Sequence, residues 1–539
     1  MNKIGFDNEK YLSMQSEHIR KRVDKFGDKL YLEFGGKLFD DYHASRVLPG
    51  FAPDSKLQML LKMKDEAEIV IVINSDAIES CKMRGDLGIT YDMDVLRLID
   101  AFREVGLYVG SVCLTQFADQ KLAKKFERTL KKLDIRTYRH YPIAGYPYDV
   151  DGIVSENGLG KNDYIETSRR LVIVTAPGPG SGKMATCISQ LYQDNKRGVK
   201  SGYAKFETFP IWNLPLKHPV NVAYEAATAD LNDVSMIDPY HVEAYGVSTV
   251  NYNRDVEIFP VLNRLFQKIY GEEIYKSPTD MGVNMAGNCI VDDAVCAEAS
   301  RQEIVRRYFA ALVDRRNDKA SDAVVSKIEL LMQQNGVTTA IRKVVAAARD
   351  KQAKTGEPAC ALELNDGTIV TGKTTRLLGA VSAMLLNALK TLSGIDDKVM
   401  LLSPSIIEPI QKLKTVHLGG HNPRLHSDEI LIALSISAVT NPVAALAMQA
   451  LAGLKGAECH STVILSQVDV NVLKKLGINY TADPIYQTKK LYHAKESVFS
   501  NVFTAGTMNR RLLFVQIGAI CAKTVDNVSR FCYNCNCFL

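Results

Sequence analysis

The chain has 539 residues and a net charge of +5, from 66 basic and 61 acidic residues. This small surplus does not indicate nucleic acid as a partner, and the chain contains no stretch of about 18 uncharged apolar residues that would indicate a membrane-spanning helix. The N-terminus lacks the apolar core of a signal peptide, so we expect a cytoplasmic protein.

Strand and helix patterns alternate through the first part of the chain. This alternation indicates an α/β fold with a doubly wound parallel sheet, whose ligands bind at the carboxyl ends of the strands. Gly35, Gly36 and Lys37 end the first strand and His43 follows it, and these residues belong either to this edge or to a plain turn. The predicted strands are 29–37, 68–73, 107–115 and 136–141, and the predicted helices are 1–28, 55–64, 93–105 and 118–133.

A glycine-rich loop joins the predicted strand 171–174 to a helix-forming segment. Glycines let consecutive backbone N–H groups point at an anion, and the helix adds its free N-terminal donors and positive dipole end. We therefore expect this loop to bind a phosphate group, such as that of ATP or another nucleotide with Mg²⁺. The expected binding residues are Gly178, Gly180, Ser181, Gly182 and Lys183.

The loop departs from the Walker A pattern of nucleotide-binding proteins at two positions. Pro177 stands where the pattern has glycine, and Met184 stands where it has a hydroxyl group for Mg²⁺. No strand aspartate of the Walker B type follows, and the nearest candidate, Asp76, lies upstream. A purely structural turn from strand to helix is therefore the alternative, and an ordinary ATPase cycle is not favoured.

A second lysine-containing segment, 367–374, matches the Walker A spelling in full. Its inner residues are β-branched, and the preceding Asn365-Asp-Gly367 is typical of a tight turn. The context predicts a β-hairpin and not a phosphate-binding loop.

The stretch 203–288 is rich in Asp, Asn, His, Lys and aromatic residues and shows little long periodicity. Loops of this composition are typical of substrate pockets, where carboxylates hold Mg²⁺ or act as general bases. The alternative is that these side chains satisfy one another and the loop backbone. The candidate catalytic or substrate-binding residues are Lys205, Glu207, His218, Asp230, Asp238, His241, Arg254 and Asp255.

Three helices are predicted at 294–314, 321–335 and 338–350. The mixed charges of 301–307 are typical of a solvated helix face, so we expect no chemistry in this helical subdomain.

A second α/β unit follows from residue 356. It is predicted to hold the hairpin, helices at 376–392, 430–438 and 444–454, and strands at 399–402 and 461–465. Its histidines could form a zinc site, although their spacing matches no standard set. Anion or substrate contact by these histidines and Arg424 is the alternative. The histidines concerned are His417, His421, His426 and His460.

The C-terminal segment 495–539 differs in character from the rest of the chain. It is apolar and basic, and it contains Cys521, Cys532, Cys535 and Cys537. We interpret it as an appended tail. The predicted domains are thus 1–290, 291–355 and 356–494, followed by this tail.

Several stretches resemble a bacterial family catalogued as domain of unknown function eighteen forty-six. The resemblance spans residues 5–494 and implies a nucleotide-binding-like sheet, helical inserts and a C-terminal subdomain similar in topology to cytidine deaminases. Some members carry an ATP-dependent protease label, but this sequence contains no protease constellation. The resemblance brings no established catalytic residues. The matching stretches include Arg46-Val-Leu-Pro-Gly50, 175–184, 201–212, 251–260, 277–284 and 422–431.

The leading hypothesis is an enzyme that binds a nucleotide or other phosphorylated small molecule and catalyses phosphoryl transfer or hydrolysis. Two alternatives remain: a non-catalytic nucleotide sensor or scaffold, and metal-assisted hydrolysis in the C-terminal unit. Neither nucleic acid nor a membrane is expected as a partner, and assembly into a homo-oligomer is left open.

Overall fold

The computed structural model describes residues 4–487, apart from 37, 40, 85 and 86. Nearly all of these residues belong to one compact unit that ends at Pro484. The predicted tail 495–539, its cysteines and Lys37 lie outside the described residues. Among the described helices, none is long and apolar enough to cross a membrane.

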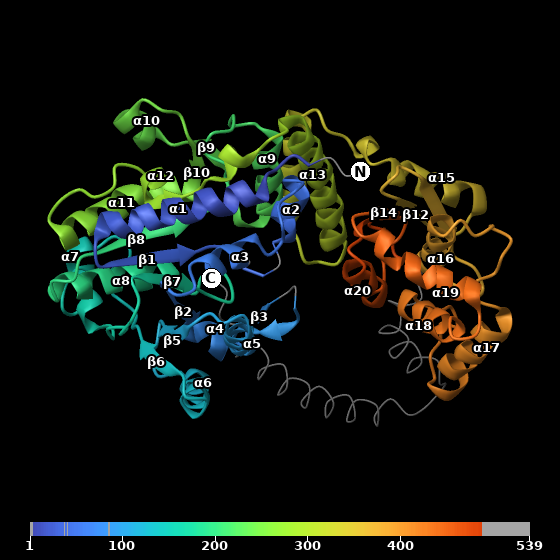
Figure 1. The fold of residues 1–539 in the computed structure, drawn as a ribbon, viewed down its shortest axis with the longest axis horizontal. Coiled ribbons are helices and arrows are strands. Elements are labelled where there is room, and N and C mark those ends of the chain that lie inside the picture. Colours follow the sequence, from blue (N-terminus) through green and yellow to red (C-terminus); the bar gives the residue numbers. More distant parts are fainter. Residues whose placement is uncertain (1–3, 37, 40, 85–86, 488–539) are drawn as a thin grey trace, which may run out of the picture. The chain divides into compact units, whose positions relative to one another are not determined.

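A parallel sheet of seven strands forms the centre of the first part of the chain (Figure 1). Its strand order is β11-β8-β1-β7-β2-β5-β6, and every neighbouring pair runs parallel. The predicted α/β class with a parallel sheet is therefore confirmed. The strands are β1 (Lys29–Phe34), β2 (Ala67–Asn74), β5 (Val109–Thr115), β6 (Arg136–Arg139), β7 (Leu171–Thr175), β8 (Ser201–Phe206) and β11 (Gly282–Val283).

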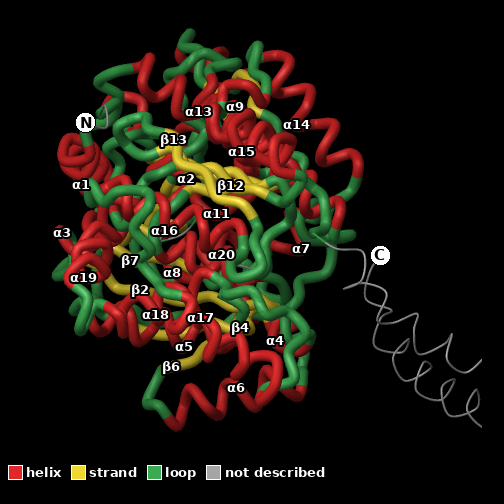
Figure 2. Tube along the Cα trace, turned by 90° about the vertical axis from the view of Figure 1, so that its right-hand side faces the viewer, coloured by secondary structure: helices red, strands yellow, loops and turns green. Residues whose placement is uncertain are grey.

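Each face of this sheet is buried against helices, which explains why its strands read as nearly continuous apolar runs. Leu30 and Leu32 belong to the core on one face, whereas Tyr31 and Val172 belong to the core on the other. Complete burial of such a side chain contributes about 1.5–3 kcal/mol. Helices surround the strands in the turned view as well (Figure 2).

Helices of the two cores come from different parts of the chain. The first core contains residues of α1 (Asn8–Phe26), α2 (Tyr42–Val47), α3 (Ser55–Lys62), α5 (Tyr91–Glu104), α6 (Lys121–Lys132) and α9 (Pro219–Ala227). The second contains residues of α7 (Val150–Ile153), α8 (Lys183–Lys196), α11 (Asn253–Tyr270) and α12 (Pro278–Met281). Smaller elements are α4 (Ser75–Glu79), α10 (Pro239–Tyr245), and the two-stranded pairs β3 (Met83–Arg84) with β4 (Ile89–Thr90) and β9 (Ser235–Ile237) with β10 (Val250–Tyr252).

The stretch 203–288 is more regular than its sequence indicates, and the prediction of mostly irregular loops is wrong there. It contains the 18-residue helix α11, whose inner face buries Val256, Phe259 and Leu262. Pro260 lies inside this helix. Proline is normally a helix breaker because it lacks the N–H group and clashes with the preceding turn. Its presence in the sequence therefore argued against a helix, although the apolar residues of α11 have regular helical spacing.

The three predicted middle helices are confirmed as α13 (Asp293–Arg316), α14 (Asp322–Gln334) and α15 (Lys343–Thr355). They lead into a four-stranded sheet of order β13-β12-β14-β15. The predicted hairpin is confirmed, because β12 (Ala359–Glu363) and β13 (Ile369–Lys373) pair antiparallel around the turn at Gly367.

Three details of the second sheet differ from the sequence-based prediction. The segment 399–402 is not a strand, although its last two leucines are buried. The strand predicted at 461–465 lies earlier, as β14 (Glu458–Ser461), and β15 (Asn479–Ala482) was not predicted. The helices here are α16 (Ala380–Leu392), α17 (Pro404–Lys412), α18 (Ser427–Ser437), α19 (Pro442–Gln449) and α20 (Gln467–Lys475).

Candidate functional site

The glycine-rich loop 176–182 occupies a central position in the large sheet. It follows β7, which lies between β1 and β2, and it leads directly into α8. From β1 the chain proceeds outward through β2, β5 and β6, returns to the centre at β7, and then passes to the opposite side at β8. A reversal of this kind creates the crevice in which open α/β sheets bind ligands.

Close packing accounts for one of the glycines in this loop. A Cβ atom at Gly178 would collide with the hydroxyl group of Tyr91, so glycine is required there for close approach. The Ser181 hydroxyl is buried and donates to the Gly178 carbonyl at 2.8 Å, while Thr115 Oγ1 donates to the Ser181 carbonyl at 2.7 Å. Ser181 therefore stabilises the loop from within.

Two features of the loop remain suited to an anion. Gly180 and Gly182 have φ values of 75° and 88°, and Gly182 is the N-cap of α8 without any side-chain cap. Lys183 stands in the first helical turn, is half-buried, and makes no hydrogen bond or ion pair with any residue that the structure describes. The uncapped helix end thus carries an unpaired positive charge, where the helix dipole also favours an anion.

Lys205, Glu207 and Asp255 form a buried charge cluster at the carboxyl ends of β1 and β8. The Lys205 Nζ atom lies 2.7 Å from Glu207 Oε1 and 2.6 Å from Asp255 Oδ2. Glu33 is the register partner of Lys205 on β1 and accepts a hydrogen bond from the Tyr203 hydroxyl at 2.7 Å. The structure therefore brings together three of the eight predicted residues and adds Glu33, which the sequence-based prediction missed.

The charges in this cluster shift each other's protonation. Burial opposes the charge of Lys205, but the carboxylates of Asp255, Glu207 and Glu33 outweigh it and raise the pKa of Lys205. Burial and the nearby charge of Asp255 raise the pKa of Glu207, against the attraction of Lys205. A raised pKa moves a carboxyl group toward the range in which general acids and bases work.

Glu33 connects this cluster electrostatically with the loop. Burial raises the pKa of the Cys187 thiol in α8, and the charges of Glu33 and Lys183 both act on it, in opposite directions. Arg254, next to Asp255, adds a further charge and lies 3.3 Å from the buried Asp233.

The other four predicted residues have structural partners or lie in solvent. Asp238 caps α10 and accepts a hydrogen bond from Thr279 Oγ1 at 2.6 Å, and His241 Nδ1 lies 2.9 Å from Ser277 Oγ. His218 caps α9 and its Nε2 atom lies 3.0 Å from Asp293. Asp230 is exposed.

The four C-terminal histidines do not gather into a metal site. His426 Nδ1 lies 3.1 Å from Asp469, whereas His460 is buried on β14 with its Nδ1 atom 2.9 Å from Thr481 Oγ1. His417 and His421 are exposed. In the part of the chain that the structure describes, no three His, Cys, Asp or Glu side chains could jointly hold a metal ion. Arg424 donates to the carbonyl of Thr375 at 2.8 Å.

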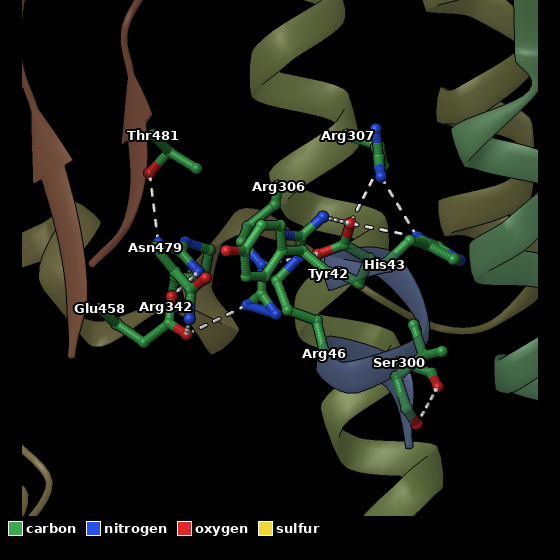
Figure 3. A network of polar contacts seen from close by, with 12 residues as sticks. Tyr42, His43, Arg46, Ser300, Arg306, Arg307, Arg342, Glu458, Asn479 and Thr481 are labelled. Atoms are coloured by element: carbon green, nitrogen blue, oxygen red, sulfur yellow. Dashed lines mark hydrogen bonds and ion pairs between the residues drawn. The ribbon is translucent and has the colours of Figure 1, made fainter. Parts of the chain in front are cut away.

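Arg46, Arg306, Arg307 and Arg342 belong to one network of polar contacts (Figure 3). The sequence-based prediction missed this network, because it assigned 301–307 to a solvated helix face. Glu303 is only 1% exposed. Its carboxylate accepts hydrogen bonds from Arg46 at 2.8 and 3.0 Å, from Arg306 at 2.8 Å and from Arg307 at 2.9 Å. The spacing of Glu303 from Arg306 and Arg307 places them on one helix face, but nothing in the sequence indicates that Arg46 and a burying surface complete the set.

A second carboxylate extends this network toward the C-terminal sheet. Glu458 Oε1 accepts from Arg306 Nη1 at 3.2 Å, and Glu458 Oε2 accepts from Arg342 Nη1 at 2.6 Å. Arg342 is 2% exposed and also donates to the Cys459 carbonyl at 3.2 Å. The helical subdomain therefore contains buried charges, contrary to the prediction of a solvated helix face at 301–307.

Known proteins match almost the whole chain. Residues 4–336 match the N-terminal domain of unknown function DUF1846, and residues 340–492 match the corresponding C-terminal domain. The chain is 59% identical over 492 residues to a UPF0371 protein of Streptococcus sanguinis, which covers 91% of this chain and 100% of that relative. UPF0371 proteins of Streptococcus pyogenes and Streptococcus thermophilus are 58% identical over the same length, with the same coverage of both chains.

Proposed function

We propose that this chain, which belongs to the DUF1846 family, binds a nucleotide or another phosphorylated small molecule at the carboxyl edge of its large sheet. The observation that carries the proposal is Lys183, a half-buried lysine without an ion-pair partner among the described residues, at the uncapped start of α8. A phosphate group there would meet the lysine charge, the helix N–H donors and the positive end of the helix dipole.

The remaining site residues would bind the rest of the ligand. Lys205, Glu207, Asp255 and Arg254 offer donors and acceptors for its hydroxyl or base groups. A Mg²⁺ ion does not fit between Glu207 and Asp255, because the Lys205 ammonium group already lies between them.

The cluster also supports a catalytic role. A phosphoryl transfer depends mainly on positioning and on neutralising charge, which Lys183 would supply. Glu207, whose pKa is raised by burial, would exchange the proton of the attacking or leaving oxygen. A cytoplasmic location, where nucleotides and sugar phosphates occur, is part of this proposal.

A thermal-shift screen with nucleotides and sugar phosphates, each with and without Mg²⁺, tests the binding. A ligand present at a hundred times its Kd stabilises the folded state by about 2.7 kcal/mol. We expect Lys183→Ala to abolish the shift. Lys196→Ala, at the other end of α8 and paired with Glu156, serves as the matched control and should keep the shift. An unchanged shift in Lys183→Ala would rule out the loop as the phosphate site.

The second candidate is a nucleotide sensor without catalysis. Met184 favours it, because the usual hydroxyl group for Mg²⁺ is missing at this position. A binding nucleotide that is never turned over would support the sensor, whereas turnover that depends on Lys183 would support the enzyme.

The C-terminal sheet supports a cytidine-deaminase-like topology only at the level of strand directions. β12 runs antiparallel to β13 and β14, while β14 and β15 run parallel. Its histidines lie apart, and the described residues contain no group of three His, Cys, Asp or Glu side chains that could hold a metal ion. The proposal therefore does not include metal-assisted hydrolysis in this sheet.

A further inference from the structure

The arginine network around Glu303 and Glu458 has more positive than negative charge. Four guanidinium groups, those of Arg46, Arg306, Arg307 and Arg342, face these two carboxylates. No other carboxylate of the described residues lies at ion-pair distance from the four arginines, so two positive charges are left without a counter-charge. Charges held in a protein interior are normally paired, because desolvation is costly. The two buried arginines, Arg306 and Arg342, do have carboxylate partners, so the surplus falls on the partly exposed Arg46 and Arg307.

Histidine does not reduce this surplus. Burial and the charges of Arg307 and Arg46 lower the pKa of His43, against the effect of Glu303, so the ring is neutral at neutral pH. His43 Nδ1 lies 3.2 Å from Arg307 Nη2 and 3.4 Å from Glu303 Oε1. The neutral ring either accepts a hydrogen bond from Arg307 or donates one to Glu303, according to its tautomer.

Several donors of the network also lack an acceptor. Arg342 Nε and His43 Nε2 are enclosed, and neither atom has a hydrogen-bond partner among the described residues. The Nη1 groups of Arg46 and Arg307 also have no acceptor among the described residues, but they belong to partly exposed side chains and are not enclosed. A buried donor without an acceptor destabilises the protein by about 1–3 kcal/mol. The free Nη1 donors of Arg46 and Arg307 and the surplus positive charge indicate the same kind of ligand, an oxyanion.

Exposure shows which arginines an anion could reach. The side chains of Arg46 and Arg307 are 27% and 31% exposed, whereas Arg306 and Arg342 are almost completely buried. Arg46 comes from α2, which follows β1, and Arg307 comes from α13 (Figure 3). Glu303 holds both guanidinium groups in place, so little side-chain entropy would be lost on binding.

We propose that Arg46 and Arg307 together bind a phosphoryl group on the open side of this network. The surplus of two charges matches the charge of about −1.5 to −2 that a phosphate monoester carries at neutral pH. A planar guanidinium group is well suited to phosphate because it donates two parallel hydrogen bonds. This site is separate from the loop 176–182 and does not depend on the function proposed for it.

The test is calorimetric titration with inorganic phosphate at constant ionic strength, maintained with sodium chloride. We expect Arg46→Ala and Arg307→Ala each to weaken phosphate binding at this site at least tenfold. In either variant Glu303 keeps two of its three arginine partners, so both variant proteins should fold. Circular dichroism would verify this. Arg315→Ala, on the same helix and paired with the exposed Asp322, is the matched control and should bind as the wild type does.

Lys183→Ala separates this site from the loop. If it removes all phosphate binding while Arg46→Ala and Arg307→Ala bind normally, the arginine site is refuted and the loop is retained. Phosphate binding that persists in Lys183→Ala and is lost on adding Arg46→Ala supports the arginine site. Absence of phosphate binding in the wild type, or equal binding of acetate, would overturn the proposal. If Arg46→Ala fails to fold, Arg46→Lys, which keeps the charge but not the paired donors, should still weaken binding several-fold.

Discussion

Lys205 is the residue on which the buried cluster depends, because it is the counter-charge for two carboxylates. Glu207 and Asp255 both lie within 2.7 Å of its Nζ atom. At the scale of single residues, composition alone could indicate that 203–288 contains a site, but not which charges meet. Lys205 and Asp255 are 50 residues apart, and only the folding of β8 and α11 brings them together.

Replacing Lys205 by methionine should destabilise the protein. Removal of one member of a buried ion pair costs about 3–5 kcal/mol, because the partner charge is left uncompensated. We expect the free energy of unfolding to fall by an amount near the lower limit of this range, since one fifth of the Lys205 side chain is exposed. Urea unfolding measures the change. In the double variant Lys205→Met/Glu207→Gln the loss should be smaller, and equal losses in the two variants would show that the pairing does not matter.

At the scale of elements, most helices and strands follow from periodicity, and the differences have local causes. Pro260 concealed α11, and the short apolar segment 399–402 has strand composition without a neighbouring strand to pair with. The hairpin 359–373 was predictable because its turn residues and β-branched flanks agree. Contacts between distant elements, such as Arg46 with Glu303, leave no periodic pattern and could not be predicted.

Asp469 joins the starts of two helices, α18 and α20. It accepts hydrogen bonds from Ser427 Oγ at 2.7 Å and Ser466 Oγ at 2.8 Å, and it pairs with His426. Burial opposes its charge, but these bonds outweigh burial and lower the pKa of Asp469 from 3.8 to about 2. A lowered folded-state pKa stabilises the protein above the unfolded-state pKa, and this contribution is lost as the pH falls toward 2.

We therefore expect Asp469→Asn to lower the free energy of unfolding by about 2 kcal/mol at pH 5. The difference from the wild type should shrink steadily between pH 4 and pH 2, where Asp469 becomes protonated. Denaturant unfolding at several pH values measures it. Asp322→Asn, at an exposed position, should show little difference at any pH. A constant difference for Asp469→Asn down to pH 2 would contradict the assigned cause.

At the scale of the whole molecule, Glu458 connects parts of the chain that are far apart in sequence. It begins β14 of the C-terminal sheet, and its carboxylate accepts hydrogen bonds from Arg306 in α13, from Arg342 before α15 and from Asn479 in β15. Through Arg306 and Glu303 it is linked to Arg46 in α2, beside the large sheet. These contacts couple the stability of the C-terminal sheet to that of the helical subdomain and the large sheet.

Glu458→Gln should weaken this coupling. It leaves the buried Arg342 without a carboxylate partner among the described residues, at a cost of about 3 kcal/mol, while Arg306 keeps Glu303. Trp212, the single tryptophan of the chain, lies in the first part of the fold, so its fluorescence reports on that part alone, whereas far-ultraviolet circular dichroism reports on all helices and strands. In the wild type both signals should change at the same urea concentration.

In Glu458→Gln we expect circular dichroism to change first, because the C-terminal sheet unfolds before the tryptophan environment does. Glu363→Gln serves as the control, since Glu363 lies in the same sheet and has only a 3.8 Å contact with the exposed Lys343. In that variant the two signals should still coincide. If they also coincide in Glu458→Gln, other contacts between the two parts maintain cooperative unfolding, and the network acts on local stability alone.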